Sequence, residues 1–209
     1  AALRRFRALS QQAQASRMYV LATAAAREAS NGPDFIARAE DILGHEVVVL
    51  TGEEEAKYSA LGIISGFHDV DGIAGDLGGG SLELIDIRGK NFGKGIPLPL
   101  GGLRLSETVE GSLPKARTFA KKLIGDASLL KKGQGRTFYA VGGTWRNIAK
   151  LHMEIRKYPL HMMQGYELPF DEIAFFLDEI ISGANARDPA WSSISKNRRN
   201  LIPYGAIAL

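Results

Sequence analysis

The sequence of 209 residues contains no cysteine and only four histidines. Without cysteine the chain has no disulfide, no thiolate nucleophile and no Cys-type zinc site. The histidines, at positions 45, 68, 152 and 161, lack the H-E-x-x-H spacing of a zinc hydrolase, so zinc chemistry is not indicated. No apolar run approaches the roughly 20 residues that cross a bilayer, and no signal-peptide pattern opens the chain. These absences predict a soluble cytoplasmic protein without a membrane partner.

The charge balance is nearly even, with 26 Lys and Arg against 23 Asp and Glu, which gives a formal net charge of +3. That excess is too small to indicate nucleic-acid binding, although it weakly favours an anionic substrate. The length suits one large domain or two small lobes, with enough apolar content for a sizeable core. Because Ala1 is not a methionine and lies inside a helical pattern, we expect the chain to be a fragment of something longer.

The stretch from residue 73 to residue 87 carries the clearest chemical pattern. An apolar run reaches Asp76, three glycines follow at positions 78–80, and a second apolar run resumes with Glu83 near its start. This pattern predicts a β-hairpin with one acid on each arm. Glycines in the turn can adopt positive φ and expose their amides to a phosphoryl group, which Asp76 and Glu83 would flank while holding Mg²⁺. The structural alternative is an ordinary tight turn between two core strands.

Two nucleotide-binding motifs do not fit this stretch. A Walker loop needs Gly-Lys-Ser/Thr running into a helix, and a dinucleotide fingerprint needs a helix after its glycines. Here the chain continues as L-E-L-I-D-I, which is a strand pattern.

The N-terminal third alternates between helical and strand patterns. Apolar spacing predicts a helix from Leu3 to Ala13, a strand at Met18–Ala24, a helix opened by Pro33 and a strand at Val47–Leu50. The last is a continuous β-branched run, typical of parallel strands buried on both faces. The rhythm predicts an α/β layer whose ligands collect at the carboxyl ends of the strands. Arg27, predicted in a turn, and the Thr51–Glu55 segment both fall at that edge.

Three consecutive glutamates follow Thr51. Thr51 and Glu54 match a capping box, so Glu54 is predicted to cap a helix, and Glu53 complements the helix dipole. Glu55 lies in the first turn of a helix that starts at a strand end. A carboxylate there could face a bound substrate and take a proton from water.

The remainder of the chain contains a second glycine-rich junction. A polar linker at His68–Gly72 marks a boundary, so we expect one lobe over residues 1–69 and another over 70–209. In the second lobe the strand Phe138–Val141 ends in Gly142, Gly143 and Thr144 just before a helix. Free backbone amides at that helix start make a second candidate anion site. A tight packing turn between strand and helix explains the same residues.

Several segments together resemble the exopolyphosphatase and guanosine pentaphosphate phosphohydrolase family. They are A-T-A-A-A-R-E-A-S-N-G at 22–32, T-G-E-E-E-A at 51–56, D-L-G-G-G-S-L-E at 76–83, V-G-G-T at 141–144 and R-R-N-L-I-P-Y-G-A-I-A-L at 198–209. The similarity runs through nearly the whole chain in the right order. It implies the α/β fold of acetate and sugar kinases, Hsp70 and actin, in which two ribonuclease-H-like lobes close over phosphates.

The resemblance also implies roles for individual residues. Glu55 matches the family's catalytic base, Asp76 and Glu83 match its magnesium-associated acids, and Arg27 matches an active-site arginine. Its second phosphate loop corresponds to Gly78, Gly79, Gly80 and Ser81. The family's first phosphate loop, a D-x-G-S-N-S hairpin, has no counterpart here, and neither does the helical region that many members carry after the second lobe. We therefore expect an incomplete first lobe.

The resulting expectation is hydrolysis of the terminal phosphoanhydride bond of inorganic polyphosphate or guanosine pentaphosphate, assisted by Mg²⁺ and by Glu55 as general base. One alternative is an ATP-dependent kinase or ATPase of the same fold, because fold does not settle chemistry. Another is a folded fragment without catalysis. Because the first phosphate loop has no counterpart here, we expect this fragment alone to release little or no phosphate. Which substrate is preferred, and whether the full-length protein forms a homodimer, stay open.

Overall fold

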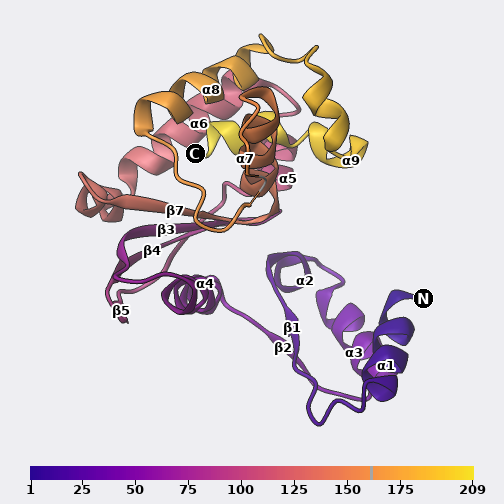
Figure 1. Cartoon of the computed structure of the whole chain (residues 1–209). Helices are drawn as coiled ribbons and strands as arrows, with labels where there is room; N and C mark the ends of the chain where they lie inside the picture. Colours follow the sequence, from indigo (N-terminus) through magenta and orange to yellow (C-terminus); the bar gives the residue numbers. More distant parts are fainter. Residues whose placement is uncertain (161) are drawn as a thin grey trace.

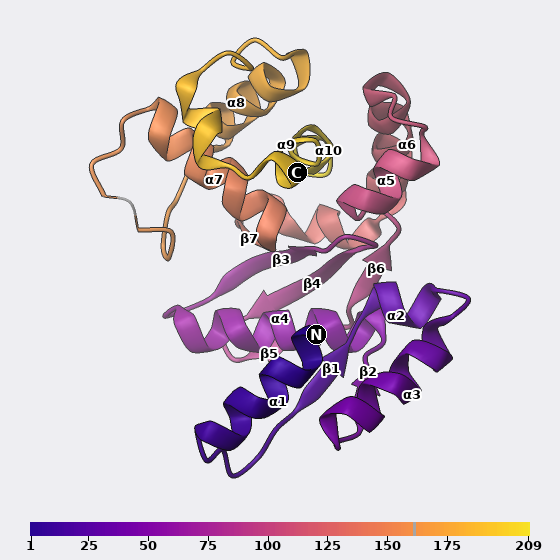
Figure 2. The same ribbon diagram turned by 90° about the vertical axis from the view of Figure 1, so that its right-hand side faces the viewer.

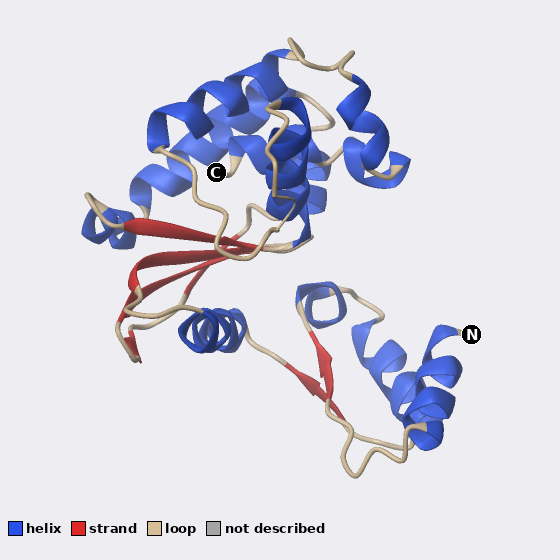
Figure 3. Cartoon of the chain, viewed as in Figure 1, coloured by secondary structure: helices blue, strands red, loops and turns tan. Residues whose placement is uncertain are grey.

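The computed structural model describes residues 1–160 and 162–209, as a mixture of helices and short strands (Figures 1 and 3). Its elements are, in chain order, α1 (Ala2–Gln12), β1 (Val20–Ala22), α2 (Ala24–Glu28), α3 (Gly32–Leu43), β2 (Val47–Val49), α4 (Gly52–Gly66), β3 (Asp71–Leu77), β4 (Leu82–Arg88), β5 (Asn91–Phe92), β6 (Ile96–Leu98), α5 (Gly102–Thr108), α6 (Leu113–Asp126), η1 (Ser128–Gly133), β7 (Thr137–Val141), α7 (Gly143–Ile155), α8 (Phe170–Ser182), η2 (Pro189–Ser193), α9 (Lys196–Arg199) and α10 (Ile202–Ile207). None of the helices in this described part is long and apolar enough to cross a membrane.

The first sheet contains only two strands. β1 and β2 pair in parallel, with Val20 opposite Val47, and Val47 joins a small apolar cluster with Ala39 and Leu43 of α3. Val48 and Val49 remain 46% and 37% exposed. The prediction that Val47–Leu50 is buried on both faces is therefore wrong for Val48 and Val49. The physical reason is that β2 has a single neighbouring strand among the described residues and is covered by helices on one side.

The second sheet is the centre of the molecule. Its strands run in the order β5-β4-β3-β7, with β6 also paired to β4; β3 is antiparallel to β4 and parallel to β7. Side chains on its strands alternate between two cores. Ile73, Leu77 and Leu84 join the larger core beneath α5 to α10, whereas Ala74 and Ile85 pack against α4. Figures 1 and 2 show α4 on one face of this sheet and α5, α6, α7, α8 and α10 on the other, while α1 to α3 lie with the first sheet.

Helix α4 connects the two sheets. It lies within residues 1–69, yet its buried face, which includes Ala56, Ala60 and Ile63, packs on the second sheet. Figure 2 shows its N-terminal end directly following β2 and its length running under β3 and β4. The division into lobes at residues 69 and 70 stays a prediction.

Candidate active site

The two acids of the hairpin lie directly opposite each other. Asp76 of β3 and Glu83 of β4 are Cα partners in the antiparallel register, one pair before Leu77 and Leu82 close the ladder at the turn. Directly opposite residues project to the same face of a sheet. Both acids lie on the face that carries Ala74 and packs against α4. The apolar contact with that helix therefore ends in a pair of carboxylates.

The glycine turn packs closely against its neighbours without unusual φ angles. None of Gly78, Gly79 and Gly80 has a positive φ, so that part of the prediction is wrong. A Cβ built on Gly101 would lie only 2.3 Å from the backbone of Gly80 and of Ser81. The carbonyl oxygen of Gly79 accepts from the amides of Leu103 (3.0 Å) and Arg104 (3.1 Å). The turn thus packs on the start of α5 at a distance that a side chain at position 101 would prevent.

Arg27 and Glu55 meet across the carboxyl edge of the first sheet. Arg27 lies in the short helix α2 and not in a turn as predicted, because the alanine run favours helix and Thr23 starts it. Its Nη1 donates to the carbonyl oxygen of Leu50 and, at 2.5 Å, to Oε1 of Glu55. The two side chains are only 25% and 14% exposed. Arg27 therefore ties the end of β2 to the first turn of α4.

Neighbouring residues at the start of α4 make different contacts. The predicted capping box is confirmed: Thr51 Oγ1 accepts from the Glu54 amide at 3.2 Å, and the Glu54 carboxylate accepts from the Thr51 amide at 2.8 Å. One turn beyond Glu55, the hydroxyl of Ser59 donates to Oδ2 of Asp76. Sequence reasoning missed Ser59, although its i+4 spacing from Glu55 puts both on one helix face.

Glu83 is the most perturbed ionisable group of the site. It is 2% exposed, and its Oε1 is buried without a hydrogen-bond partner among the described residues. Burial raises the pKa of the Glu83 carboxyl to about 7, and the charges of Glu55 and Asp76 act in the same direction. The Ser81 hydroxyl and Arg27 oppose this pKa shift. The charges of Arg27, Glu55 and Asp76 thus all act on Glu83.

This pKa makes stability depend on pH. Between pH 4.5 and about 7 the folded Glu83 holds a proton that the unfolded chain has lost. The native state then binds more protons, so the free energy of unfolding falls as the pH rises through this window. In metal-free buffer we expect Glu83 to contribute about 3 kcal/mol at low pH that is lost above pH 7. Urea unfolding at several pH values, in the wild type and in Glu83→Gln, measures this contribution.

The difference between the two proteins isolates Glu83, because groups such as His152, whose pKa burial lowers, contribute equally to both. Glutamine cannot ionise, so Glu83→Gln should be the more stable protein above pH 7. If the difference in the free energy of unfolding between wild type and Glu83→Gln is the same from pH 4.5 to pH 8, the pKa of Glu83 is not raised by burial.

The second glycine segment lies at the same sheet edge. β3 and β7 are parallel neighbours with Asp76 opposite Val141, so the residues after each strand emerge side by side. Gly142 has φ of 113°, and a Cβ there would lie 2.4 Å from the carbonyl oxygen of Leu77. This contact accounts for Gly142 as a packing turn. The anion-binding role of Gly142, Gly143 and Thr144 stays a prediction, at the start of α7 where amides point outward.

The acids of the site could bind a magnesium ion whose coordination shell is completed by water and by phosphate oxygens of the substrate. Within residues 1–160 and 162–209, no three acidic or histidine side chains converge as a metal cluster. Mg²⁺ in phosphoryl-transfer sites commonly takes one or two carboxylates and completes its shell with water and phosphate oxygens. Asp76, Glu83 and the Ser59 hydroxyl offer only oxygen ligands, and Glu83 Oε1 has no other partner. The donor set therefore suits Mg²⁺.

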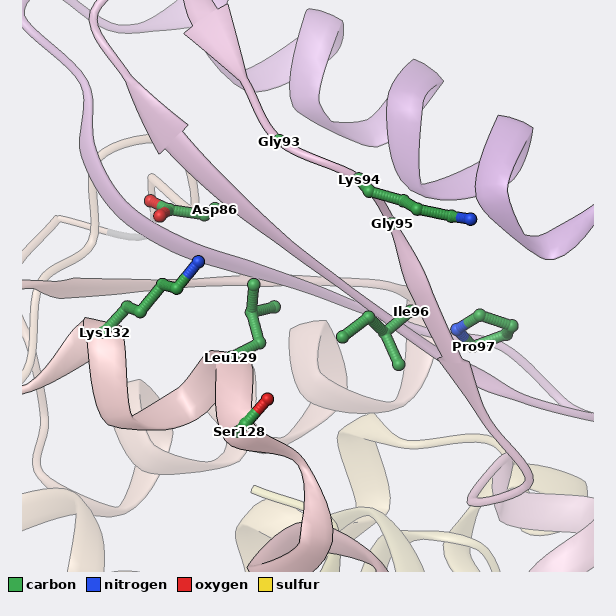
Figure 4. Close-up of a pocket in the computed structure, with 9 residues that line it drawn as sticks. All are labelled: Asp86, Gly93, Lys94, Gly95, Ile96, Pro97, Ser128, Leu129 and Lys132. Carbon is green, nitrogen blue, oxygen red and sulfur yellow. The ribbon is translucent and has the colours of Figure 1, made fainter.

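A separate hollow of about 430 Å³ lies between β6 and η1. Figure 4 shows Asp86 and Lys132 at one end of it and Ile96 and Leu129 along its middle. The lining includes none of the predicted site residues. Asp86 is already paired with Arg136 at 2.8 Å. We assign this hollow no part in the candidate site.

Comparison with known proteins decides the family. The sequence model of the Ppx/GppA phosphatase family matches residues 1–209, the whole chain. The chain belongs to the Ppx/GppA family. Its predicted α/β class and the family resemblance are both confirmed, and members of the family are phosphatases, which are hydrolases.

Three solved structures illustrate the Ppx/GppA fold. An exopolyphosphatase-like protein superposes with a TM-score of 0.85 at 24% identity, over 99% of this chain and 68% of its own. The Ppx/GppA family member of Aquifex aeolicus gives 0.75 at 23% identity, over 99% and 69%. An exopolyphosphatase from Cytophaga hutchinsonii gives 0.78 at 17% identity, over 99% and 70%. At such identities the likeness establishes the fold that carries the site.

Proposed function

We propose that the full-length protein to which this chain belongs hydrolyses the terminal phosphoanhydride bond of inorganic polyphosphate or guanosine pentaphosphate. The observation that carries the proposal is the meeting of the Arg27–Glu55 pair with the partly buried Asp76 and the buried Glu83 beside a glycine turn. A cation, a carboxylate at a helix start and a pair of magnesium-type ligands are the parts that phosphoryl transfer to water requires.

In the proposed reaction Glu55 orients a water and accepts its proton while the water oxygen attacks the terminal phosphorus in line. The bond from phosphorus to the bridging oxygen breaks, and the shortened polyphosphate leaves. Arg27 holds an equatorial oxygen of the phosphoryl group through its planar guanidinium. Substrate would thus compete for the guanidinium that now contacts Glu55.

The glycine turn would bind the phosphoryl oxygens through backbone amides. The amide of Gly78 already donates to the carbonyl oxygen of Ser81 at 2.9 Å, so the proposal rests on the amides of Gly79, Gly80 and Ser81. Asp76 and Glu83 would hold Mg²⁺. When bound, the ion would neutralise charge that develops on the phosphoryl oxygens.

A thermal-shift comparison tests the substrate class. Long-chain polyphosphate at about 100 times its Kd, with Mg²⁺, should stabilise the protein by about 2.7 kcal/mol and raise Tm by about 5 °C or more. Sodium chloride at the same ionic strength serves as the control and should leave Tm unchanged. A Tm shift with ATP and none with polyphosphate would favour the kinase or ATPase alternative and overturn the proposal.

Three further expectations stay predictions. They are the cytoplasmic location, a homodimer of the full-length protein, and the preference between the two substrates. Phosphate release from polyphosphate and from guanosine pentaphosphate at matched concentrations decides the last of these.

A further inference from the structure

A carboxylate of this chain lies between two arginines at the edge of the candidate site. Oε1 of Glu28 lies 3.5 Å from Nη2 of Arg27, and Oε2 of the same carboxylate is paired with Nη2 of Arg104. Glu28 belongs to α2 and Arg104 to α5, which are 76 positions apart. One small anion is therefore shared by two guanidiniums from separate parts of the fold.

The position of Arg104 is fixed relative to the glycine turn. Its backbone amide donates to the carbonyl oxygen of Gly79 at 3.1 Å. On the other side of the turn, a Cβ on Gly80 would lie 3.0 Å from Ala24, the first residue of the helix that carries Arg27. Arg27 and Arg104 thus lie on either side of the turn proposed to bind phosphate, and the Glu28 carboxylate lies between them.

The exposure of these side chains argues against a purely structural role. Arg104 and Glu28 are 37% and 35% exposed, and ion pairs at such positions contribute little to stability. Carboxylate and phosphate bind the guanidinium fork in the same bidentate manner. Glu28 is the sole acidic partner of Arg104 in the described part of the chain. If the Glu28 side chain turned outward, both guanidiniums would be free to bind a phosphoryl group in place of the carboxylate.

We propose that Arg104 binds the phosphoryl group next to the one that is cleaved, and that Glu28 occupies this position until substrate displaces it. The inference rests on the proposed function, because it takes the terminal phosphoryl group to lie at Arg27. Neighbouring phosphoryl groups share a bridging oxygen, so the second must lie beside the first. The site would then select anions with linked phosphoryl groups over orthophosphate.

Binding of tripolyphosphate in metal-free buffer, measured by calorimetry, tests the proposal. Arg104→Gln should weaken the affinity about tenfold or more, because charge-assisted hydrogen bonds are lost. Glu28→Gln should strengthen it, since the competing carboxylate is gone. Arg104→Lys, which keeps the charge but not the fork, should fall between wild type and Arg104→Gln. Orthophosphate affinity should stay unchanged in the two Arg104 variants, because orthophosphate would bind at Arg27 alone.

The opposite changes in tripolyphosphate affinity expected for Arg104→Gln and Glu28→Gln distinguish phosphate binding from a purely structural role of the ion pair. Both glutamine variants break the same ion pair, so a purely structural contact predicts changes in the same direction. Changes of equal sign, or an unchanged affinity in Arg104→Gln, would overturn the inference. Arg117→Gln removes an exposed ion pair with Asp178 (3.6 Å) and should leave binding unchanged.

Phosphate release from polyphosphate, assayed in parallel with Mg²⁺, keeps the two proposals distinguishable. Opposite binding changes without hydrolysis by the wild type would overturn the proposed function and support the anion site. Hydrolysis by the wild type with unchanged tripolyphosphate affinity in Arg104→Gln would overturn the role of Arg104 and leave the function standing.

Discussion

Replacing Glu55 with glutamine in the full-length protein is expected to lower kcat for phosphate release by about 10²–10⁴-fold, the usual contribution of a general base. Glutamine has nearly the same size and keeps an oxygen that can accept from Nη1 of Arg27, so the contact at 2.5 Å has a replacement. It cannot accept the proton of the attacking water. Tripolyphosphate affinity should therefore stay within a few-fold of wild type. Steady-state phosphate release and calorimetric binding measure the two effects separately.

Glu53→Gln is the matched control, because Glu53 lies on the same helical turn but faces solvent, 3.6 Å from Lys94. It loses the same charge from the same helix start, so the electrostatic effect of the helix dipole is reproduced. Its turnover should stay close to wild type. If Glu55→Gln releases phosphate within a few-fold of wild type, Glu55 is not the base. If both variants lose turnover equally, the charge of the helix start matters and the position of Glu55 does not.

The hairpin was predictable because its signals are local. An apolar run, three glycines and a second apolar run determine two strands and a turn, and the register that pairs Asp76 with Glu83 follows from the short turn between them. The capping box was equally local, since Thr51 and Glu54 satisfy each other within one helical turn. Both of these features depend only on neighbours in sequence.

The conformation of the glycine turn was not predictable, because the turn packs against residues far away in the sequence. None of its three glycines has positive φ, and a Cβ on Gly79 or Gly80 would lie 3.1 Å from Leu103 or 3.0 Å from Ala24. Three glycines in a row fit both positive φ and close packing from the sequence alone. Only the path of the chain from β6 into α5 distinguishes them.

Long-range polar contacts were missed for a similar reason. Ser59 reaches Asp76, and Glu28 reaches Arg104, only after the two sheets are positioned. The helix carrying Arg27 was also mistaken for a turn, because serine, asparagine, glycine and proline follow it closely. A search for polar residues one helical turn from Glu55 would have found Ser59. No pattern within the segment 22–32 indicates a partner for Glu28.

The second large effect is expected from Gly101→Ala, which tests whether packing of the turn on α5 shapes the site. The new Cβ would lie 2.3–2.4 Å from backbone atoms of Gly79, Gly80 and Ser81. No side chain can rotate away, so the turn or α5 must move. Overpacking typically costs about 1–3 kcal/mol, and backbone on both sides places this case at the upper end or beyond. Urea unfolding should show the loss of stability, and tripolyphosphate binding should fall with it.

Gly62→Ala is the matched control and should change stability in the opposite direction. Gly62 lies in the interior of α4, and a Cβ there meets no atom within 4 Å. Alanine in a helix interior is more stable than glycine by about 0.5–1 kcal/mol, because the unfolded chain loses less freedom. Equal stability of wild type and Gly101→Ala, with unchanged tripolyphosphate affinity, would mean that the turn tolerates displacement. The contact between Gly101 and the turn would then not determine the shape of the phosphate site.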